Sequence, residues 1–447
     1  MAGVAEGSGR LRRLLGAFLV AVVVGGCSDQ GGDVPPGKTV LEMWHSQKRQ
    51  NEDALEDIVA RFNAQNATYH VRLHNIGSYT ALFRKARATL QSGQLPDLCI
   101  CYPSMVAEFM EADAVLPLDD LLRDPQHGFT REELDDIFPV FLEDNRYPEF
   151  GNRLLSFPFT KSLLMLYYNA EILRAAGHKG PPETWEEFIA QCRDVKAKTG
   201  KLPFAYSRDP SSFDSMVMSL GGRLASVEDR RSHFDSPEAI RALEILHTLA
   251  SEGLAQVIAF GSDEDRTLFA NGRVAFIMRS STTRAYMAKD IVDERGRDRF
   301  EWGMACPPVG KGQPRQTVLY GGNILVFKSN RKRHLGAWEF IKFFVSPEIT
   351  AEWSVRTGYL PIRRSAARTK TLQEFFARHP RNRVPFETIP YSRREPSVAG
   401  WQAVRTHIAT ALTRVVTGRM SPAQAARELA RAADAELARF AQRAGKR

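Results

Sequence analysis

Apolar positions in the first part of the chain change between two spacings, which predict strands and helices in turn. Residues 39–44 (TVLEMW) have the β-branched and aromatic composition of a strand. The apolar residues that follow, Leu55, Ile58, Val59 and Phe62, have the spacing of a helix with one apolar side. Two further strand and helix pairs are predicted at 69–73 and 81–90, and at 96–102 and 104–110. This order favours a mainly parallel sheet in an α/β domain.

A longer apolar run, residues 154–169 (LLSFPFTKSLLMLYYN), breaks this rhythm. It is interrupted by Pro158 and a polar Thr-Lys-Ser, which suits a strand that leaves one domain and enters another. Short, fully apolar strands are predicted at 274–278 (VAFIM) and 324–327 (ILVF). The chain from about 401 to 440 has a helical pattern.

The N-terminus has the pattern of an export signal. Arginines at 10–13 precede an apolar run at 14–24, and small residues lead to Cys27. The run is about half of the ~20 residues that a spanning helix needs. Residues 24–27 (VGGC) resemble a bacterial lipobox, which implies cleavage before Cys27 and acylation of that residue; in the alternative, the peptide is an ordinary secretory one. We therefore expect a signal peptide at 1–26, a Gly- and Pro-rich lipidated tether at 27–38, and a periplasmic or otherwise extracytoplasmic protein that is anchored to the membrane.

The charge of the chain narrows the class of partner. Its 447 residues carry a formal net charge of +9, and much of the excess lies in the last third, as in Arg331-Lys332-Arg333 and Arg393-Arg394. A basic balance is one sign of nucleic-acid binding. Acidic residues are mixed through the body, however, and an exported protein rarely meets nucleic acid, so we expect no nucleic-acid partner. A solvated surface near anionic lipid headgroups is the alternative explanation.

Motifs that would indicate catalysis are absent from the sequence. It contains no Gly-x-Ser-x-Gly, His-Glu-x-x-His, Walker or Gly-x-Gly-x-x-Gly motif. The acidic pairs Asp119-Asp120 and Asp135-Asp136 could flank a glycosidic bond, but their polar surroundings favour solvated positions. Cys99 and Cys101 share one face of a predicted strand and have no nearby His or Cys partner, so buried thiols are favoured over a metal site. We expect no enzyme activity, no metal and no cofactor.

Polar and aromatic residues gather where the predicted strands begin or end. They are Trp44 and His45, Gly77 to Tyr79, Ser280 to Thr282, Tyr320 to Asn323, and Gly358 and Tyr359. In open α/β sheets, ligands bind beyond the carboxyl ends of the strands. Glycines let the backbone approach a ligand, aromatic faces stack on a polyol or sugar, and hydroxyls and amides bind its OH groups. The pattern therefore indicates recognition of a neutral, hydroxyl-rich solute.

The same segments carry a family resemblance over nearly all of the chain beyond Cys27. The motifs are MWHS (43–46), ARFNAQN (60–66), LYYN (166–169), GGN (321–323), FIKFFVSPE (340–348) and RTGYLPIRRSA (356–366). In this order they resemble the extracellular solute-binding proteins of carbohydrate-type ABC importers. The WHS start, GSYTALF (77–83), RTGYLPI and the helical tail look most like the glycerol-3-phosphate and glycerophosphodiester receptors.

The resemblance implies a fold, partners and a mechanism. The fold is α/β and of the two-lobed periplasmic-binding-protein type II, with crossing strands between the lobes and a helical C-terminal segment. We expect one lobe at 39–155 and 275–328, and the other at 156–274 and 329–447. The expected partners are a small solute, an ABC permease with its ATPase and, through the lipid anchor, the membrane, and we expect the chain to be a monomer.

The resemblance also implies site residues. Tyr79, Ser162, Ser281, Gly322 and Tyr359 match the ligand-lining positions of the glycerol-phosphate receptors. Two positions depart from their pattern: Tyr102-Pro103 stands where an acidic residue follows the third strand, and Ser397 or Ala399 where an arginine binds phosphate. Candidates to replace that arginine are Arg393, Arg394, Lys161 and Arg208. The full predicted set of ligand residues is Trp44, His45, Tyr79, Tyr102, Ser162, Arg208, Ser281, Gly322, Asn323, Tyr359 and Arg393.

The sequence therefore predicts a receptor for a sugar, a polyol or a phosphorylated glycerol derivative. Two alternatives remain at this point: an exported glycan-degrading enzyme, and a surface adhesin or scaffold that binds no small ligand. A binding cleft without facing carboxylates would count against the enzyme, and the lack of a deep cleft would favour the scaffold.

Overall fold

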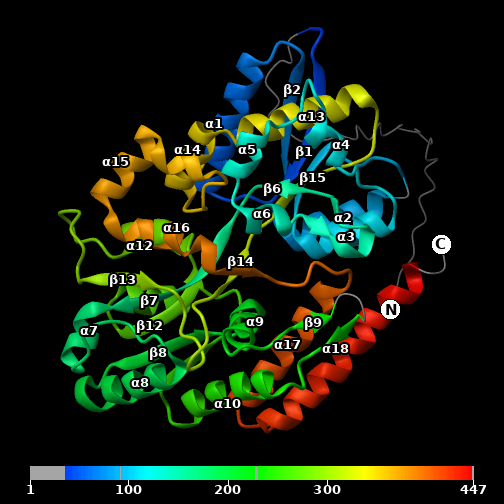
Figure 1. The fold of residues 1–447 in the computed structure, drawn as a ribbon. Coiled ribbons are helices and arrows are strands. Elements are labelled where there is room, and N and C mark those ends of the chain that lie inside the picture. Colours follow the sequence, from blue (N-terminus) through cyan, green and yellow to red (C-terminus); the bar gives the residue numbers. More distant parts are fainter. Residues whose placement is uncertain (1–35, 91, 227–229, 445–447) are drawn as a thin grey trace, which may run out of the picture. The chain divides into compact units, whose positions relative to one another are not determined.

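The computed structural model describes residues 36–90, 92–226 and 230–444. The described residues from Gly37 onward belong to one compact unit. Its strands form two large sheets, with the first in the upper half of Figure 1 and the second in the lower half. The predicted signal peptide and Cys27 lie outside the described residues.

The first sheet has five strands, in the order β2-β1-β3-β15-β6. Their bounds are β1 (Thr39–His45), β2 (Tyr69–Asn75), β3 (Leu98–Cys101), β6 (Phe157–Pro158) and β15 (Asn323–Val326). The strand β1 pairs in parallel with β2 and β3, as the β-α-β-α order predicted, whereas β15 runs antiparallel to β3 and β6. The helices between these strands are α1 (Gln50–Gln65), α2 (Tyr79–Thr89) and α3 (Pro103–Glu111).

Alternate residues of the first sheet face different helices, because successive strand side chains point to opposite sides. Leu98 and Ile100 pack in the same core cluster as the predicted apolar side of α1 and with α13 (Arg331–Phe344). Cys99 and Cys101 pack in the cluster that contains α2 and α3. Their Sγ atoms lie 3.3 Å apart and both thiols are free and buried, which confirms that they share a face.

The second sheet has seven strands, in the order β11-β8-β12-β7-β14-β16, with β13 also paired to β7. Their bounds are β7 (Ser162–Asn169), β8 (Leu202–Ser207), β11 (Ala255–Ile258), β12 (Val274–Ser280), β13 (Trp302–Ala305), β14 (Thr317–Tyr320) and β16 (Ser392–Arg394). One face packs against α8 (Trp185–Thr199), α9 (Pro210–Ser219), α10 (Pro237–Ser251) and α17 (Trp401–Val416). The predicted C-terminal helical segment is α17 together with α18 (Pro422–Ala444), which lies along α17 and α10.

The remaining elements are short or cover the sheet edges. The helices are α4 (Asp119–Arg123), α5 (Arg131–Asp136), α6 (Pro139–Glu143), α7 (Ala170–Ala175), α11 (Glu264–Ala270), α12 (Thr283–Asp290), α14 (Pro347–Thr357), α15 (Lys370–Arg378) and α16 (Val384–Thr388). The 3₁₀ helices are η1 (Pro148–Phe150), η2 (Arg364–Arg368), η3 (Pro380–Arg383) and η4 (Ile389–Tyr391), and the short strands are β4 (Arg146–Tyr147), β5 (Arg153–Leu154), β9 (Ala225–Ser226) and β10 (Arg231–Ser232). Among the described residues, no helix has both the length and the hydrophobicity of a membrane span.

The described chain passes between the two sheets three times, and the third passage is the long segment from β15 to β16. The run predicted to cross domains does so, because β6 belongs to the first sheet and β7 to the second. The chain crosses back between β14 and β15 through Gly321 and Gly322. At Gly321, where φ is +117°, a Cβ would lie 1.4 Å from the Thr160 carbonyl oxygen, so only glycine allows the first two crossings to touch.

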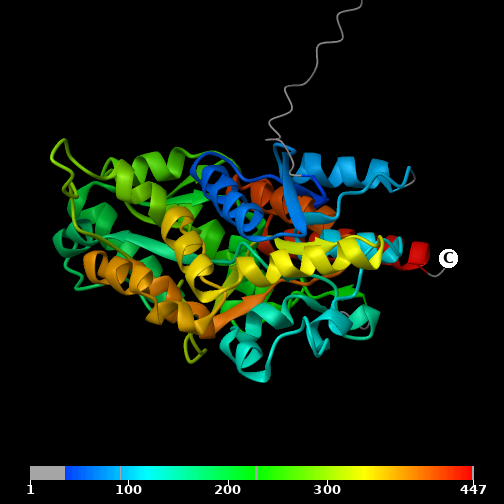
Figure 2. The same ribbon diagram turned by 90° about the horizontal axis from the view of Figure 1, so that it is seen from above.

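The expected lobe boundaries stay a prediction, but the strand pairing divides the chain differently. Residues 275–328 were assigned to the first lobe, yet β12, β13 and β14 hydrogen-bond within the second sheet. Residues from 329 onward were assigned to the second lobe, yet α13 packs on β1 of the first sheet. The apolar pattern predicted the strand at 274–278 but contained no information on which sheet would bury it. Figure 2 shows α13 (yellow) beside the strands of the first sheet.

Candidate functional site

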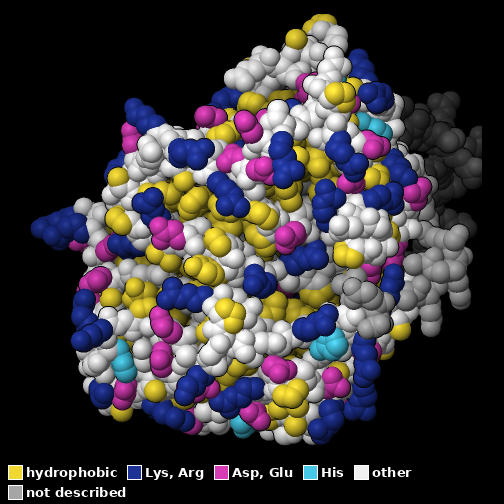
Figure 3. Space-filling view, viewed as in Figure 1, with side chains coloured by type: hydrophobic (Ala, Val, Ile, Leu, Met, Phe, Trp, Pro, Cys, Tyr) yellow, Lys and Arg dark blue, Asp and Glu magenta, His cyan; other side chains and the backbone are white. Residues whose placement is uncertain are grey.

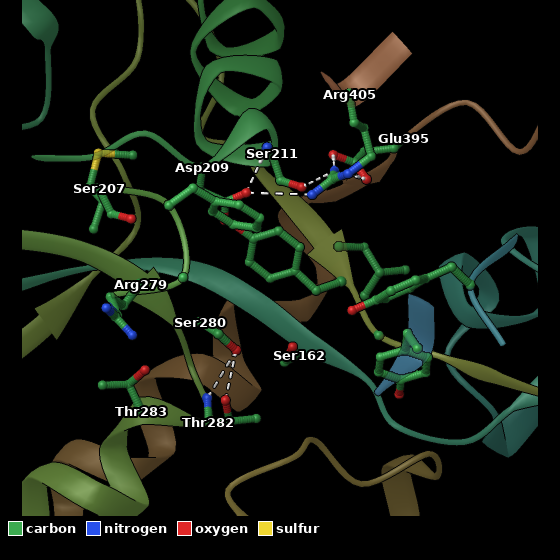
Figure 4. A pocket seen from close by; sticks show the side chains of 18 of the residues that line it. Ser162, Ser207, Asp209, Ser211, Arg279, Ser280, Thr282, Thr283, Glu395 and Arg405 are labelled. Atoms are coloured by element: carbon green, nitrogen blue, oxygen red, sulfur yellow. Dashed lines mark hydrogen bonds and ion pairs between the residues drawn. The ribbon is translucent and has the colours of Figure 1, made fainter. Parts of the chain in front are cut away.

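The first cavity has a volume of about 580 Å³ and is lined by elements that belong to both sheets. Tyr102 follows β3 of the first sheet. Asp209 follows β8 of the second sheet, and Tyr320 ends β14. Ser280 ends β12, and Figure 4 shows it with Thr282 across the cavity from Asp209. The cavity therefore lies at strand ends, where the sequence pattern predicted a binding site.

Three tyrosines give the first cavity aromatic surfaces. The rings of Tyr79 and Tyr102 lie 4.3 Å apart between centroids at an interplanar angle of 34°. The ring of Tyr359 stacks on Trp353 at 5.8 Å with an angle of 1°. Burial raises the pKa of Tyr79 to about 12 and also raises the pKa values of Tyr102 and Tyr359. All three hydroxyls are therefore neutral hydrogen-bonding groups at physiological pH.

Arg405 on α17 joins two carboxylates at one side of the first cavity (Figure 4). Its Nη1 lies 2.9 Å from Oε1 of Glu395, and its Nη2 lies 3.5 Å from Oδ1 of Asp209. The hydroxyl of Tyr320 donates to Oδ2 of Asp209 at 3.4 Å. Burial raises the pKa of Asp209, although the Arg405 guanidinium opposes the shift. When both carboxylates are ionised, the group carries one net negative charge, because a single guanidinium pairs with two carboxylates.

Asp214 lies directly behind this group. Its side chain is fully buried, and neither of its oxygens accepts a hydrogen bond from a described residue. Burial, followed by the neighbouring Glu395 carboxylate, raises its pKa well above the usual range. Its burial beside Glu395 therefore favours the neutral, protonated form of the carboxyl group.

A buried ion pair lies at another part of the cavity wall. Nζ of Lys161 lies 2.6 Å from Oδ2 of Asp144, and the Lys161 side chain has no exposed surface. Nδ2 of Asn323 donates to the same carboxylate oxygen at 3.2 Å. Burial lowers the pKa of Lys161, and the Asp144 charge opposes that change. Since Asp144 lines the cavity, this pair fixes a compensated carboxylate at its surface.

The arginines near α11 are also paired. Nε of Arg279 donates to Asp265 at 2.7 Å and Nη1 donates to Asp263 at 3.1 Å. Nε of Arg266 lies 3.3 Å from Asp290. Among the described residues that line the first cavity, the cations without an ion pair are Lys48 and Arg49, and both are exposed. The inner surface of the cavity therefore has no unpaired cation.

The structure brings four of the predicted ligand residues together, since Tyr79, Tyr102, Ser162 and Tyr359 line the first cavity. Their role as ligand contacts stays a prediction. No group of three His, Cys, Asp or Glu residues in the described part of the chain could hold a metal ion.

Three other predicted residues support the cavity wall without lining it. Oγ of Ser281 accepts the Leu163 N–H at 3.2 Å. The N–H of Gly322 donates to Thr160 at 2.8 Å, and a Cβ at this glycine would lie 2.8 Å from the Tyr79 hydroxyl. Asn323 binds Asp144, as described above. These residues position the groups that line the cavity.

Trp44 and His45 do not line the first cavity. Trp44 is buried in the α2 and α3 cluster, with Nζ of Lys85 at 4.3 Å from its ring centroid. His45 is 1% exposed, and burial, with a smaller effect of His74, lowers its pKa to about 4. Its Nδ1 accepts the backbone N–H of Gln47 at 3.3 Å. The location of these two residues at the end of a strand was therefore not enough to predict whether their side chains reach the cavity.

The predicted arginines do not reach the first cavity. Nη1 of Arg208 hydrogen-bonds to Thr413 of α17. Arg393 lines a second cavity of about 670 Å³, which shares with the first cavity the residues Glu395 and Pro396. The phosphate role suggested for Arg393 in the binding site therefore has no geometric support.

The sequence interpretation missed Asp209, Glu395 and Arg405. Asp209 follows a strand and also caps α9, because its Oδ1 accepts the Ser211 N–H at 3.1 Å, so a signal was present in the Asp-Pro pair. Glu395 and Arg405 are separated from it by nearly the whole second half of the chain. Only the packing of α17 against α9 brings the three together.

Comparisons with known proteins agree on a family. The sequence model for "bacterial extracellular solute-binding protein" matches residues 57–380. The sn-glycerol-3-phosphate-binding periplasmic protein UgpB of Yersinia pseudotuberculosis is 26% identical over 424 residues, which cover 90% of this chain and 93% of that protein. The protein of the same name from Escherichia coli is 24% identical over 406 residues, covering 87% and 90%.

Solved structures show the fold. UgpB of Mycobacterium tuberculosis in complex with glycerophosphocholine aligns with a TM-score of 0.77 and 22% identity, covering 91% of this chain and all of that one. The sugar-binding protein MalE of Xanthomonas citri aligns with a TM-score of 0.78 and 23% identity, covering 90% and 98%. The predicted fold class, a two-lobed α/β type II fold with crossing strands and a helical C-terminal segment, is confirmed.

Proposed function

Because the chain belongs to the bacterial extracellular solute-binding protein family, we propose that it is the receptor of an ABC importer and captures a neutral, hydroxyl-rich solute in the first cavity. The volume of about 580 Å³ lies within the roughly 300–1,000 Å³ of small-molecule sites. A sugar or a polyol has the matching chemistry.

The observation that carries this proposal is the pairing of charges around the cavity. Asp209 and Glu395 keep free oxygen lone pairs after they bind Arg405, so they can accept hydrogen bonds from a vicinal diol. The serine and threonine hydroxyls at the ends of β7 and β12 can donate or accept. The tyrosine faces are suited to the C–H surface of a sugar ring. A neutral ligand satisfies these groups without introducing an uncompensated charge.

Capture would proceed by closure of the two lobes over the solute. The cavity draws residues from both sheets, and a ligand that contacts both stabilises the closed arrangement over the open one. Delivery to a permease follows from the family role. The lipid anchor at Cys27, the signal peptide and the monomeric state belong to the same proposal and rest on the sequence pattern.

A phosphorylated glycerol derivative is the second candidate. The names of the relatives from Yersinia and Escherichia support it. Lys48 and Arg49, at the exposed side of the cavity, are the cations available to a phosphate. Guanidinium groups are effective phosphate ligands because they can form two parallel hydrogen bonds, and of these two cations only Arg49 can do so.

The enzyme alternative is less well supported. Carboxylates do line the cavity, contrary to the simple criterion set from the sequence. Asp144 is paired with Lys161, and Asp209 and Glu395 share Arg405. A glycosidase needs one carboxyl group as acid and another as base or nucleophile, whereas these groups are held by cations. We therefore propose a receptor without catalytic activity, and the absence of product after prolonged incubation with oligosaccharides tests this.

Thermal unfolding of the full chain against a panel of sugars, polyols, glycerol-3-phosphate and glycerophosphocholine tests the proposal directly. A solute at 100 times its Kd should add about 2.7 kcal/mol to the free energy of unfolding. We expect the largest shift from a neutral member of the panel, and a shift with phosphorylated members alone would favour the second candidate. If no hydroxylated solute gives a shift, the receptor proposal is wrong.

Tyr359→Ala tests the location of the site. Removing the ring should weaken the binding of the solute, measured by calorimetry, by roughly tenfold, since an aromatic contact contributes about 0.5–1.5 kcal/mol beyond its area. Tyr391→Ala is a control, because Tyr391 is 44% exposed and does not line the first cavity. Equal affinities of the two variants would remove Tyr359 from the site.

A further inference from the structure

The second cavity combines an arginine-rich lining with apolar walls. It is lined by four arginines from three separate parts of the chain: Arg223 after α9, Arg364 in η2, and Arg393 and Arg394 in β16. None of the four forms an ion pair with a described residue, although the chain has many arginine–carboxylate pairs elsewhere. Four like charges gathered without partners create a positive potential in the cavity.

Acidic groups at this cavity do not balance the arginines. Glu143 and Glu395 line it, and the Glu395 carboxylate is already held by Arg405 of the first cavity. Glu143 is exposed and forms no ion pair with a described residue. The cavity therefore has an excess of positive charge, in contrast to the first cavity.

Most guanidinium donors around the second cavity remain available. Arg394 uses Nη1 on the backbone carbonyls of Glu143 and Arg146, at 2.6 and 3.2 Å. Arg393 uses Nη1 on the adjacent Ser392 carbonyl at 3.2 Å. Each guanidinium has five N–H donors, so several on each of the two side chains are free for a ligand.

A buried hydroxyl provides a second, independent indication of a ligand. Ser397 lines the second cavity and is 9% exposed, yet its Oγ has no hydrogen-bond partner among the described residues. Buried polar groups are almost always hydrogen-bonded in folded proteins. An oxygen-rich ligand in the cavity would satisfy this hydroxyl.

The rest of the lining is apolar. It includes Phe138, Val140, Met218, Leu224, Ile389 and several prolines. The guanidinium carbon of Arg364 lies 5.3 Å from the ring centroid of Phe138, so charge and apolar surface adjoin. Figure 3 shows hydrophobic side chains among Lys and Arg groups in the middle of the face that carries α6 and β14 in Figure 1.

We propose that the second cavity is a separate binding site for a phosphate group carried on an apolar body. The phosphate would lie among the arginines and Ser397, because a dianion best offsets several unpaired guanidinium groups. The apolar part would contact Phe138 and its neighbours. The linings of the two cavities have only Glu395 and Pro396 in common, so the phosphate site is distinct from the solute site of the proposed function.

Calorimetric titration of the full chain with n-hexyl phosphate tests the site, with n-hexanol as the uncharged match. We expect saturable binding of hexyl phosphate and at least tenfold weaker binding after Arg223→Ala combined with Arg393→Ala. Arg295→Ala is the matched control, because Arg295 is exposed, lies outside both cavities and has no ion pair among the described residues. Ser397→Ala is a milder variant that keeps every charge and should weaken binding severalfold.

Two further measurements locate and identify the phosphate. Tyr359→Ala should leave hexyl phosphate binding unchanged, and loss of binding in this variant but not in the double arginine variant would place the phosphate in the first cavity and overturn the proposal. A comparison of phosphatidylglycerol vesicles with phosphatidylcholine vesicles distinguishes two sources of the phosphate, a lipid headgroup and a soluble phosphate ester. Arginine-dependent binding to anionic vesicles as well as to hexyl phosphate identifies a lipid headgroup, whereas arginine-dependent binding of hexyl phosphate without vesicle binding identifies a soluble phosphate ester. Binding of neither probe, or binding that does not depend on the arginines, would contradict the site.

Discussion

The two cavities are adjacent and similar in volume, about 580 and 670 Å³, but they treat charge in opposite ways. In the first cavity, buried Lys161 and Arg405 each meet a carboxylate. In the second cavity, Arg393 and Arg394 meet backbone carbonyls and no carboxylate of the described residues. Compensated charges suit a neutral ligand, and uncompensated charges of one sign suit an ion. The partners of the arginines at a cavity therefore indicate the charge of its ligand better than the number of those arginines does.

The largest effect should come from breaking the Lys161–Asp144 pair. Lys161→Met leaves the Asp144 carboxylate, 4% exposed, without its cation. Removing one partner of a buried ion pair costs about 3–5 kcal/mol, and we expect that loss in the free energy of unfolding from urea denaturation. Lys201→Met, at an exposed lysine without an ion pair among the described residues, should change it by less than about 0.5 kcal/mol.

The double variant Lys161→Met, Asp144→Asn separates charge from packing. Because it removes both charges, it should recover most of the stability that the single variant loses. If the double variant is as unstable as the single one, lost packing rather than the uncompensated carboxylate is the cause. The contrast between the two cavities would then not rest on this pair.

The next largest effect concerns Arg405. Arg405→Ala removes the cation shared by Asp209 and Glu395 and should weaken the binding of a neutral solute by about 30-fold, since a hydrogen bond to a charged group contributes roughly 1.5–3 kcal/mol. Arg405→Lys keeps the positive charge but cannot form the bidentate hydrogen bonds of a guanidinium group. Its affinity for the solute should lie between those of the native chain and the alanine variant. Calorimetry measures the affinities, and thermal unfolding without solute checks the fold. Unchanged affinity in the alanine variant would mean that Arg405 is structural only.

Burial beside Glu395 favours the neutral form of the Asp214 carboxyl group. Its pKa is raised, first by burial and then by Glu395, while Arg405 lowers it and Asp209 raises it further. The native state therefore binds a proton that the unfolded state has lost above pH ~4. That stabilisation is fully present below the unfolded pKa and is lost as the pH rises through the folded pKa, with a slope of up to ~1.4 kcal/mol per pH unit.

Asp214→Asn should remove this slope, because the amide needs no proton to remain neutral. The free energy of unfolding, measured from pH 4 upward, should therefore fall less with pH in this variant than in the native chain. Asp235→Asn, at an exposed carboxylate, is the control and should keep the native slope. A native slope in Asp214→Asn would show that the side chain is ionised and that the cavity wall holds an uncompensated charge.

These charged groups also mark the limit of what the sequence could predict. Local pattern identified several strands, the crossing segment and the residues Tyr79 and Tyr359, because strand ends are set by nearby residues. Tyr102 and Ser162 were expected from the family resemblance. It did not identify the partners of the arginines, since Arg405 meets Asp209 across 196 positions. Trp44 and His45 lie at the predicted strand end but do not line the first cavity, because the direction of a side chain depends on which helices cover each face of the sheet. Their role as ligand residues stays a prediction.

The smallest expected effect is the sharpest test of the comparison. Arg393 was predicted from the sequence to bind ligand phosphate, but it lines the second cavity and its nearest described hydrogen-bond partner is a backbone carbonyl. Arg393→Ala should change the affinity for a neutral solute by less than about twofold, the range of an ordinary surface substitution. The measurement is the same calorimetric titration used for Arg405→Ala. If the two variants lose affinity equally, the cavities act as one site, and the partners of the arginines would no longer distinguish a neutral ligand from an anionic one.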